Sequence, residues 1–408
     1  MAGTVMRRTL RWLFGEEGTV AAETELQIVM GSTAMSVAGI FVISPIVSEL
    51  AGPFSVSEAA AGQLVTAFTA PSIVLVPLMG ALADRIGRKP VLAGGLLIFA
   101  VAGAAVALTP SFPIALGLRA IQGFGYAAII PIGVAILGDL YGGGREATAQ
   151  GLRTASIQAT NLLSPLLAGG LVLVSWRYPF LLFLVAIPIA AWTWLRLPRI
   201  DAAEPTSLRA YSYDLATSLS QPVMGSIMLS FTIRFLLIFA FFAYISVLLA
   251  ESIGASAVTS GFIVSAFGLI SLLTSTQVGR LTAVANTFLI MFVGFLALGG
   301  GLAIMGVAGS RVGLGAGVLL VGLGAGVTGP VQKSLVTQLV PSARRAGAVS
   351  SAVVFQSVGQ AGGPLVVGIA LGIISVGQAF VAVGLLGGTI GALLLGIAYA
   401  RSERSDIT

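Results

Sequence analysis

Long apolar segments alternate with short polar segments along almost the whole chain. Each apolar segment continues for about 20 residues before charged residues, proline or glycine interrupt it, which is the length that an α-helix needs to cross a membrane. The pattern therefore predicts an all-α, polytopic membrane protein with twelve transmembrane helices. The first six lie at 25–49, 58–82, 91–109, 114–138, 147–173 and 179–197. The second six lie at 221–249, 257–278, 284–307, 312–336, 347–374 and 377–400.

A polar stretch separates the two sets of six segments. Residues 198–220 form the longest polar stretch, and they contain proline and charges of both signs. We therefore expect two six-helix bundles, at 25–197 and 221–401, joined by a cytoplasmic linker at 198–220. Residues 1–24 and 402–408 are expected to be cytoplasmic segments at the two ends.

The composition excludes a soluble fold and several kinds of chemistry. Only 9% of the residues are charged and 57% are hydrophobic, whereas a soluble domain carries about a quarter charged residues. Cysteine and histidine are both absent, which excludes disulfides, thiolate metal sites and imidazole acid–base catalysis. The sequence holds no catalytic constellation, so we expect no enzyme activity, no metal and no cofactor.

The distribution of Lys and Arg predicts the orientation in the membrane. These residues gather in the terminal segments and in alternate loops, whereas the predicted outer loops contain only Arg177 and Arg311. The positive-inside rule then places both termini in the cytoplasm and the chain in the cell inner (plasma) membrane. The lipid bilayer and a small-molecule substrate are the expected partners of a monomer, and the scattered positive charge argues against a nucleic-acid partner.

The two halves resemble each other when the chain is shifted by 199 residues. The matches need no gap and fall mainly on glycine and proline, which set helix contacts and kinks. Chance similarity between apolar segments would not keep these residues in one register. Such a repeat suggests a carrier with its site between the halves. The matched pairs include Gly62 with Gly261, Gly123 with Gly322, Gly125 with Gly324, Pro131 with Pro330, Arg145 with Arg344, and Pro165 with Pro364.

One polar loop resembles the signature of a known family. Residues 80–90, between the second and third segments, read Gly-Ala-Leu-Ala-Asp-Arg-Ile-Gly-Arg-Lys-Pro. This resembles the loop motif G-x-L-x-D-R-x-G-R-K-x of the major facilitator superfamily, and the number of segments, the linker and the repeat agree with that family. The resemblance implies the fold of two pseudo-symmetric six-helix bundles and the function of a solute carrier.

The resemblance also implies that this loop is a conformational latch. In the family, the carboxylate at the position of Asp84 braces the eleventh helix in the outward-open state, and here that helix begins near Arg345. A helix N-terminus favours an anion. Asp139 is the expected partner of the loop arginines, and Gly80 is expected to permit close helix contact. A solvated turn is the alternative. The expected latch comprises Gly80, Asp84, Arg85, Gly87, Arg88, Lys89 and Asp139.

Two further segments resemble members that couple transport to protons. Residues 119–125 contain Arg-x-x-Gln-Gly, similar to the R-x-x-Q-G motif of proton-coupled members, which suggests proton coupling through Arg119 and Gln122; structural pairing of the arginine is the alternative. Residues 161–170 resemble a degenerate form of the Gly-Pro motif of drug antiporters. The residues expected to kink or pack the helices are Pro131, Pro165, Pro330, Gly363 and Pro364.

Polar side chains within the segments suggest a central cavity. Arg234 lies near the middle of the seventh segment with no carboxylate nearby in sequence, which favours a position facing a cavity. Each of the others can instead form only a hydrogen bond between helices. The candidate cavity residues are Tyr126, Gln158, Asn161, Arg234, Tyr244, Gln356 and Gln360.

Three functions are compatible with these features. The first is an exporter of amphipathic compounds that resembles the drug:proton antiporters, with the proton gradient as its energy source. The second is a facilitator or symporter of a sugar or organic anion, because no Asp, Glu or His lies in the middle of a segment. The third, an intramembrane enzyme or a receptor, is disfavoured because no catalytic constellation is present.

Overall fold

The fold is entirely helical in the part of the chain that the structure describes. This computed structural model describes residues 20–199, 222–339 and 345–405, and no strand occurs in these ranges. The predicted fold class is therefore confirmed. Most of the expected linker at 198–220 and most of the expected N-terminal segment lie outside the described residues.

The first half contains six membrane-spanning units, several of them interrupted. Proline accompanies several of the interruptions: at Ser44–Pro45, for example, the first unit changes to a 3₁₀ turn. The units are α2 (Thr24–Phe41), η2 (Ser44–Ile46) and α3 (Val47–Phe54); α4 (Glu58–Ala61), α5 (Gln63–Thr69) and α6 (Ser72–Ile86); α7 (Arg88–Ala105) and η3 (Val106–Leu108); α8 (Phe112–Leu140); α9 (Gly143–Val172); and α10 (Tyr178–Leu181), η4 (Leu182–Val185) and α11 (Ala186–Arg196).

The second half repeats this plan with longer helices. Two of these helices begin with a side-chain N-cap. The Ser256 side chain accepts a hydrogen bond from the backbone N–H of Thr259, and the Asn286 side chain accepts one from the backbone N–H of Phe288. A short helix that the hydropathy pattern did not predict, α15, lies in the connection before α16. The helices are α13 (Pro222–Ile253), α14 (Ala257–Ser275), α15 (Val278–Val284), α16 (Thr287–Val307), α17 (Arg311–Leu339), α18 (Arg345–Ala370) and α19 (Val376–Ser405).

The helix α9 differs from the other spans in its polarity. Eleven described helical units are long and apolar enough to cross a membrane, and α9 is the twelfth. Its 30 residues exceed the length that a span needs, but its polar residues lower its mean hydropathy. It packs against α2 in its own half and α14 in the other half, so much of its surface faces protein rather than lipid.

Glycine contacts show that the 199-residue repeat is also structural. A Cβ placed on Gly125 would lie 2.5 Å from the carbonyl oxygen of Gly95, where α8 crosses α7. A Cβ placed on Gly324 would lie 2.5 Å from the carbonyl oxygen of Gly294, where α17 crosses α16. Gly294 and Gly324 lie 199 positions after Gly95 and Gly125, so the two halves pack the corresponding helices in the same way.

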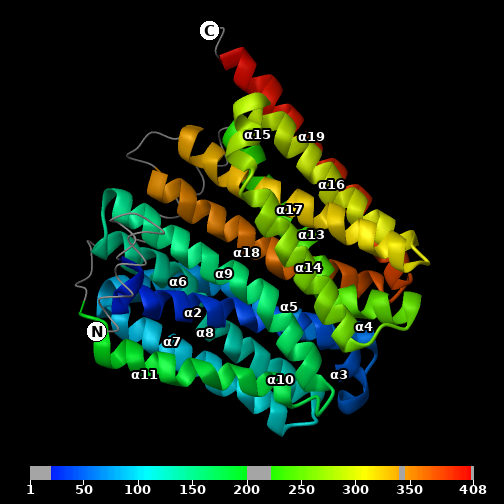
Figure 1. Ribbon diagram of the computed structural model, residues 1–408, viewed down its shortest axis with the longest axis horizontal. Helices are drawn as coiled ribbons and strands as arrows, with labels where there is room; N and C mark the ends of the chain where they lie inside the picture. Colours follow the sequence, from blue (N-terminus) through cyan, green and yellow to red (C-terminus); the bar gives the residue numbers. More distant parts are fainter. Residues whose placement is uncertain (1–19, 200–221, 340–344, 406–408) are drawn as a thin grey trace.

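The two halves meet at one end of the molecule, which we call the closed end. Figure 1 shows α3 and α4 beside the lower end of α14 at this end. Phe41 packs edge-on against Phe242, with ring centroids 4.4 Å apart. The hydrogen bonds between the halves run from Ser44 to the Phe242 carbonyl, Gln63 to the Tyr244 hydroxyl, Tyr244 to the Ala59 carbonyl, Thr69 to the Gln360 carbonyl, Tyr126 to the Gln360 amide, and Ser265 to the Leu162 carbonyl.

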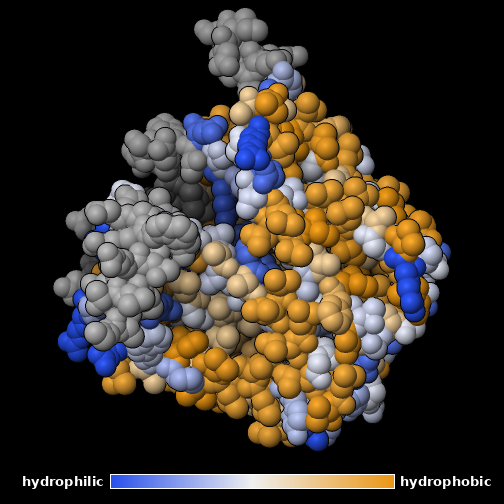
Figure 2. Space-filling model, viewed as in Figure 1, coloured by the Kyte–Doolittle hydropathy of each residue, from blue (hydrophilic) through white to orange (hydrophobic). Residues whose placement is uncertain are grey.

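At the opposite end, which we call the open end, the halves separate. The ion pairs there join residues of the first half to each other: Arg88 to Asp139, and Arg145 to Glu23. Figure 2 shows hydrophilic residues where the halves separate, whereas the surface of the two bundles in this view is largely hydrophobic. In the part of the chain that the structure describes, the hydrogen bonds between the halves lie at the closed end and in the middle of the molecule. We call the region between the halves on the open side of these contacts the chamber.

Candidate functional site

The loop of residues 80–90 makes a sharp turn between two spans at the open end. Gly87 ends α6 and precedes α7 with φ of +93°, a conformation that only glycine adopts readily. The next residue, Arg88, is nearly buried and forms an ion pair with Asp139 at the end of α8. Its guanidinium also lies 3.7 Å from the carboxylate of Asp84. The pairing of a loop arginine with Asp139 was expected from the sequence.

Two expected features of the latch are not formed in this conformation. A Cβ on Gly80 would meet no atom within 4 Å, so the prediction of a close helix contact at Gly80 is wrong for this state. The physical reason is that the Cα of Gly80 faces open space in this conformation. Asp84 pairs with Arg88 rather than with another helix. The expected contact of Asp84 with the start of α18 is a feature of the outward-open state, and it stays a prediction.

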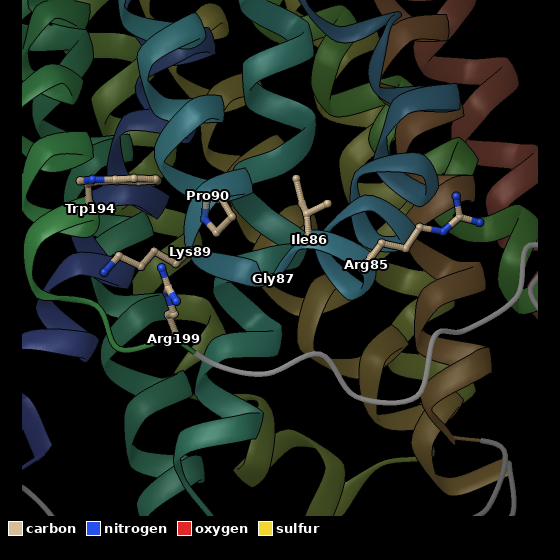
Figure 3. A pocket seen from close by; sticks show the side chains of 7 residues that line it. All are labelled: Arg85, Ile86, Gly87, Lys89, Pro90, Trp194 and Arg199. Atoms are coloured by element: carbon tan, nitrogen blue, oxygen red, sulfur yellow. The ribbon is translucent and has the colours of Figure 1, made fainter.

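The loop of residues 80–90, together with Trp194 and Arg199, lines a positively charged pocket at the open end. The pocket has a volume of about 480 Å³, and Figure 3 shows Lys89, Arg199 and Trp194 gathered at one side of it, with Arg85 at the other. The ammonium of Lys89 lies 6.0 Å from the centre of the Trp194 ring. The lining residues are Arg85, Ile86, Gly87, Lys89, Pro90, Trp194 and Arg199.

Arg119 is fully buried inside the first half and is held by oxygen atoms of three helical units. Its Nη1 donates to the Gln122 side chain at 2.6 Å. Its Nε donates to the carbonyl of Leu64 at 3.1 Å, and its Nη2 donates to the carbonyl of Gly39 at 2.8 Å. The guanidinium also lies 4.3 Å from the centre of the Phe68 ring. The arginine therefore ties α8 to α2 and α5.

The break in the first span explains why a carbonyl is available to Arg119. The N–H of Val42 bonds to Ala38 and that of Ile43 bonds to Ile40, so neither takes the carbonyl of Gly39. Arg119 has no contact with a carboxylate among the described residues. A role of Arg119 and Gln122 in proton coupling stays a prediction.

Three of the candidate cavity residues belong to the contacts between the halves. Tyr126 of α8 donates to the Gln360 side chain of α18 at 3.3 Å, in the middle of the molecule. We call this contact the roof of the chamber. Tyr244 was expected in the cavity, but it is fully buried at the closed end, where Gln63 and the carbonyl of Ala59 surround its hydroxyl. Tyr244 is therefore part of the closure in this state.

Arg234 lies in the wall of the chamber and is half-buried. Its Nε donates to the hydroxyl of Thr328 at 2.9 Å, and its Nη2 donates to the carbonyl of Ala325 at 3.1 Å. Gly329 leaves room for the guanidinium, because a Cβ there would lie 2.7 Å from Nη2. These two bonds use two of its five N–H groups.

The other candidate cavity residues lie on α9 and α18. The amide of Asn161 donates to Gln158 at 3.1 Å, and both side chains are half-buried, as is Gln356. The expected kink and packing residues lie inside helices or at their crossings. Gly363 lies so close to the Leu236 carbonyl that a side chain would clash. The prolines inside helices are Pro131, Pro165, Pro330 and Pro364.

The structure adds two basic residues that the sequence analysis did not select. Lys333 of α17 lies one helical turn after Gly329, which packs against the guanidinium of Arg234, and Arg153 of α9 donates to the side chain of Gln150 at 3.0 Å. Both residues lie inside predicted membrane spans. Because an ionisable residue in a span is a functional candidate by default, their position was the signal that could have identified them.

The described carboxylates lie at the ends of the spans. The carboxylates at the open end are Glu23, Glu25, Asp84, Asp139 and Glu146, and the carboxylates at the closed end are Glu49, Glu58 and Glu251. Near the closed end, the charges of Glu49 and Glu251 act on Glu58. In the described part of the chain, the charged residues deep in the bundles are therefore Arg119, Arg153, Arg234 and Lys333.

Comparisons with known proteins agree with this architecture. The family model of the Major Facilitator Superfamily matches residues 29–364. A solved bacterial homologue of the human lysosomal transporter Spinster, in an inward-facing and unoccupied conformation, is similar with a TM-score of 0.70 and 16% identity, covering 92% of this chain and 95% of that chain. This likeness concerns the fold.

Curated relatives are similar over a shorter segment. A chloramphenicol resistance protein of Pseudomonas aeruginosa is 34% identical over 169 residues, which cover 38% of this chain and 40% of that protein. The multidrug resistance protein MdtM of Escherichia coli O157:H7 is 31% identical over 144 residues, which cover 35% of each. The chain thus spans less than half the length of the curated relatives that it matches.

Proposed function

Because the chain belongs to the major facilitator superfamily, we propose that it is a secondary active transporter that exports amphipathic, drug-like compounds by alternating access. The observation that carries the proposal is the unequal contact between its halves. They are joined by hydrogen bonds and packed rings at one end and separated at the other, so a compound can enter the chamber from one side only. The names of the curated relatives support export of drug-like compounds.

The proposed orientation places the open end in the cytoplasm. The loops at this end carry Arg85, Arg88, Lys89 and Arg145, and the positive-inside rule assigns such loops to the cytoplasm. The described state is then the one that takes up a compound from the cell. The proposed location is the inner membrane, with the chain working as a monomer.

The proton gradient is the proposed energy source. Since the described carboxylates lie at the ends of the spans, coupling has to use one of these edge groups or competition for a buried arginine. A facilitator that needs no proton is the second candidate function, and the same distribution of carboxylates favours it.

Reconstituted liposomes test both candidates. The purified protein is supplied with ethidium, chloramphenicol or fluorescein, which represent cationic, neutral and anionic compounds, under an imposed pH gradient. Accumulation that nigericin abolishes supports the antiporter. Down-gradient flux that is unchanged without a pH gradient supports the facilitator. A protein that moves none of these probes contradicts the transport proposal for all three charge classes.

The latch has a separate test. Asp84→Asn removes the charge that pairs with Arg88 in this state and that is proposed to brace α18 in the other state. We expect slower transport with unchanged expression. The control is Arg280→Gln, an exposed change in α15 of the other half. Wild-type turnover in the Asp84 variant would contradict the latch.

A further inference from the structure

Two basic side chains from separate segments of the first half line the pocket beside the loop of residues 80–90. Lys89 lies in the first turn of α7, and Arg199 follows the end of α11. The two helices pack against each other, and Figure 3 shows both side chains on the same side of the pocket, next to Trp194. The ammonium of Lys89 lies 6.0 Å from the centre of the Trp194 ring. We call Lys89, Trp194 and Arg199 the basic pocket.

The positive charge of the basic pocket is not balanced within the part of the chain that the structure describes. The ion pairs of the described residues are formed by Arg88 and Arg145, and none of them involves Lys89 or Arg199. None of the described residues that line the pocket is acidic. In addition, α7 begins in this pocket without a side-chain cap, and a helix N-terminus favours an anion. The basic pocket therefore suits an anionic group.

Apolar, exposed side chains border the basic pocket. Trp194 is 58% exposed and Leu195 is 75% exposed, and both lie near the end of α11, the last helix of the first half. Tryptophan is typical of the boundary between the hydrocarbon and the headgroups of a bilayer. The basic pocket thus lies at the depth of lipid headgroups and is bordered by side chains that acyl chains can contact. This position favours a lipid over a free inorganic anion.

We propose that the basic pocket binds the phosphate of an anionic glycerophospholipid, such as phosphatidylglycerol, from the leaflet at the open end. Clusters of Lys and Arg immediately beside a membrane span attract anionic headgroups. The guanidinium of Arg199 can form two parallel hydrogen bonds with a phosphate, and the ammonium of Lys89 adds a point charge. The acyl chains then lie along the exposed side of α11. The inference needs only that the chain spans a membrane, so it is independent of the transported compound.

The positive charge makes the basic pocket selective among lipids. In phosphatidylcholine the phosphate carries a cationic choline group, which the pocket repels, whereas the phosphate of phosphatidylglycerol has no cation attached. Each Lys or Arg near a membrane surface contributes about 1 kcal/mol to the attraction of anionic lipid, which corresponds to about fivefold in affinity. Because two such residues act together, they predict about 25-fold preference for phosphatidylglycerol.

Lipid binding to the purified full-length protein tests the basic pocket. The protein, in a neutral detergent, is titrated with phosphatidylglycerol and with phosphatidylcholine of identical acyl chains. Native mass spectrometry measures the fraction of the protein that carries one bound lipid. We expect phosphatidylglycerol to bind about 25-fold more tightly than phosphatidylcholine. Lys89→Gln and Arg199→Gln should each weaken the binding of phosphatidylglycerol about fivefold and leave the binding of phosphatidylcholine unchanged.

The matched control is Arg177→Gln at the closed end. Arg177 is exposed and also lies against a tryptophan, with its guanidinium 5.0 Å from the centre of the Trp176 ring, so both affinities should be unchanged. An equal loss of phosphatidylglycerol binding in this variant overturns the lipid site. Equal affinity for the two lipids, or insensitivity of the Lys89 and Arg199 variants, also overturns it. Displacement of phosphatidylglycerol by inorganic phosphate at constant ionic strength would assign the pocket to free anions and overturn the lipid.

The acidic residues that follow Arg199 in the sequence provide a second control. Asp201 and Glu204 lie outside the described residues. When both are replaced by their amides, an unchanged affinity for phosphatidylglycerol supports the lipid site. A rise of more than about fivefold, the contribution of one charge, would show that these carboxylates occupy the basic pocket, and it overturns the proposal. If Lys89→Gln does not fold, Arg199→Gln on its exposed side chain gives the answer. Lipid binding needs no flux, so its failure leaves the transport function untouched.

Discussion

Two arginines inside the membrane bundles, Arg119 in the first half and Arg234 in the second, show opposite ways of keeping a positive charge there. Arg119 has no exposed surface, and three hydrogen bonds and an aromatic ring surround it. Arg234 is half-buried, and its two hydrogen bonds use two of its five N–H groups. The first arrangement uses the charge to hold helices together, and the second leaves it available to a ligand.

The difference bears on the energy source for transport. Arg119 can exchange a proton or meet a ligand only if its enclosure opens, whereas Arg234 is only half-buried in this state. An anionic compound that leaves a cell with a negative interior is driven outward by the membrane potential, with about 2.3 kcal/mol per charge per 100 mV. Export of an anion therefore needs no carboxylate in the middle of a span.

The largest expected effect comes from removing the enclosed charge. Arg119→Leu leaves the carbonyls of Gly39 and Leu64 and the side chain of Gln122 without their donor in an apolar interior. We expect a loss of about 3 kcal/mol or more in the free energy of unfolding, because each unsatisfied buried group costs about 1–3 kcal/mol. The apparent Tm of the purified protein, followed by tryptophan fluorescence, measures it. A Tm equal to that of the wild type would contradict the structural role of Arg119.

A smaller loss of stability is expected when the packing around Arg119 and Gln122 is made too tight than when the Arg119 side chain is removed. In Gly103→Ala the new methyl group would overlap the amide of Gln122 and come 2.7 Å from a ring carbon of Phe183. Overpacking of this kind costs about 1–3 kcal/mol, and the Tm should fall. The matched control is Gly94→Ala in the same helix, where a Cβ meets nothing within 4 Å and the Tm should hold or rise. Equal Tm values for the two variants would mean that the enclosure is loosely packed.

The corresponding change in the second half should cost less stability than Arg119→Leu. Arg234→Leu releases only Thr328 and the Ala325 carbonyl, and water in the chamber can replace the lost donors. We expect a loss of about 1–2 kcal/mol. A loss as large as that of Arg119→Leu, measured by the same Tm assay, would place Arg234 among the structural charges and remove the contrast.

The sequence predicted the fold well because hydropathy, charge and glycine spacing act locally. Span positions follow from the length of apolar runs, and the turn at Gly87 follows from a residue that tolerates φ of +93°. The polar α9 was also predicted, although its mean hydropathy is below that of the other spans.

The site was less predictable, because it depends on which helices face each other. Nothing in the sequence around Lys333 relates it to Arg234, since the two residues come from helices that meet only in the folded chain. Similarly, Tyr244 carries the same hydroxyl wherever it lies, and only the packing of the two halves assigns it to the closed end. Likewise, the glycine at position 80 does not reveal whether a helix packs on it, and in this conformation none does.

The smallest expected effect on stability separates the two arginines most sharply. In Gly329→Ala the new methyl group would lie 2.7 Å from Nη2 of Arg234 and 3.2 Å from Cζ, so it meets the far end of a flexible side chain that can move into the chamber. We expect the free energy of unfolding to change by about 0.5 kcal/mol or less, the range of substitutions that meet no fixed neighbour.

Binding should nevertheless respond to this displacement. A guanidinium moved away from Thr328 is no longer held in its hydrogen-bonding geometry. The affinity for an anionic aromatic probe, 2-naphthoate, should therefore fall about three- to tenfold, while the affinity for its uncharged analogue 2-naphthamide is retained. Gly315→Ala, on the same helix with nothing within 4 Å of its Cβ, is the matched control for both measurements. A drop in Tm as large as that of Gly103→Ala would show that Arg234 is as tightly enclosed as Arg119. Unchanged binding would show that its position in the chamber does not matter to the ligand.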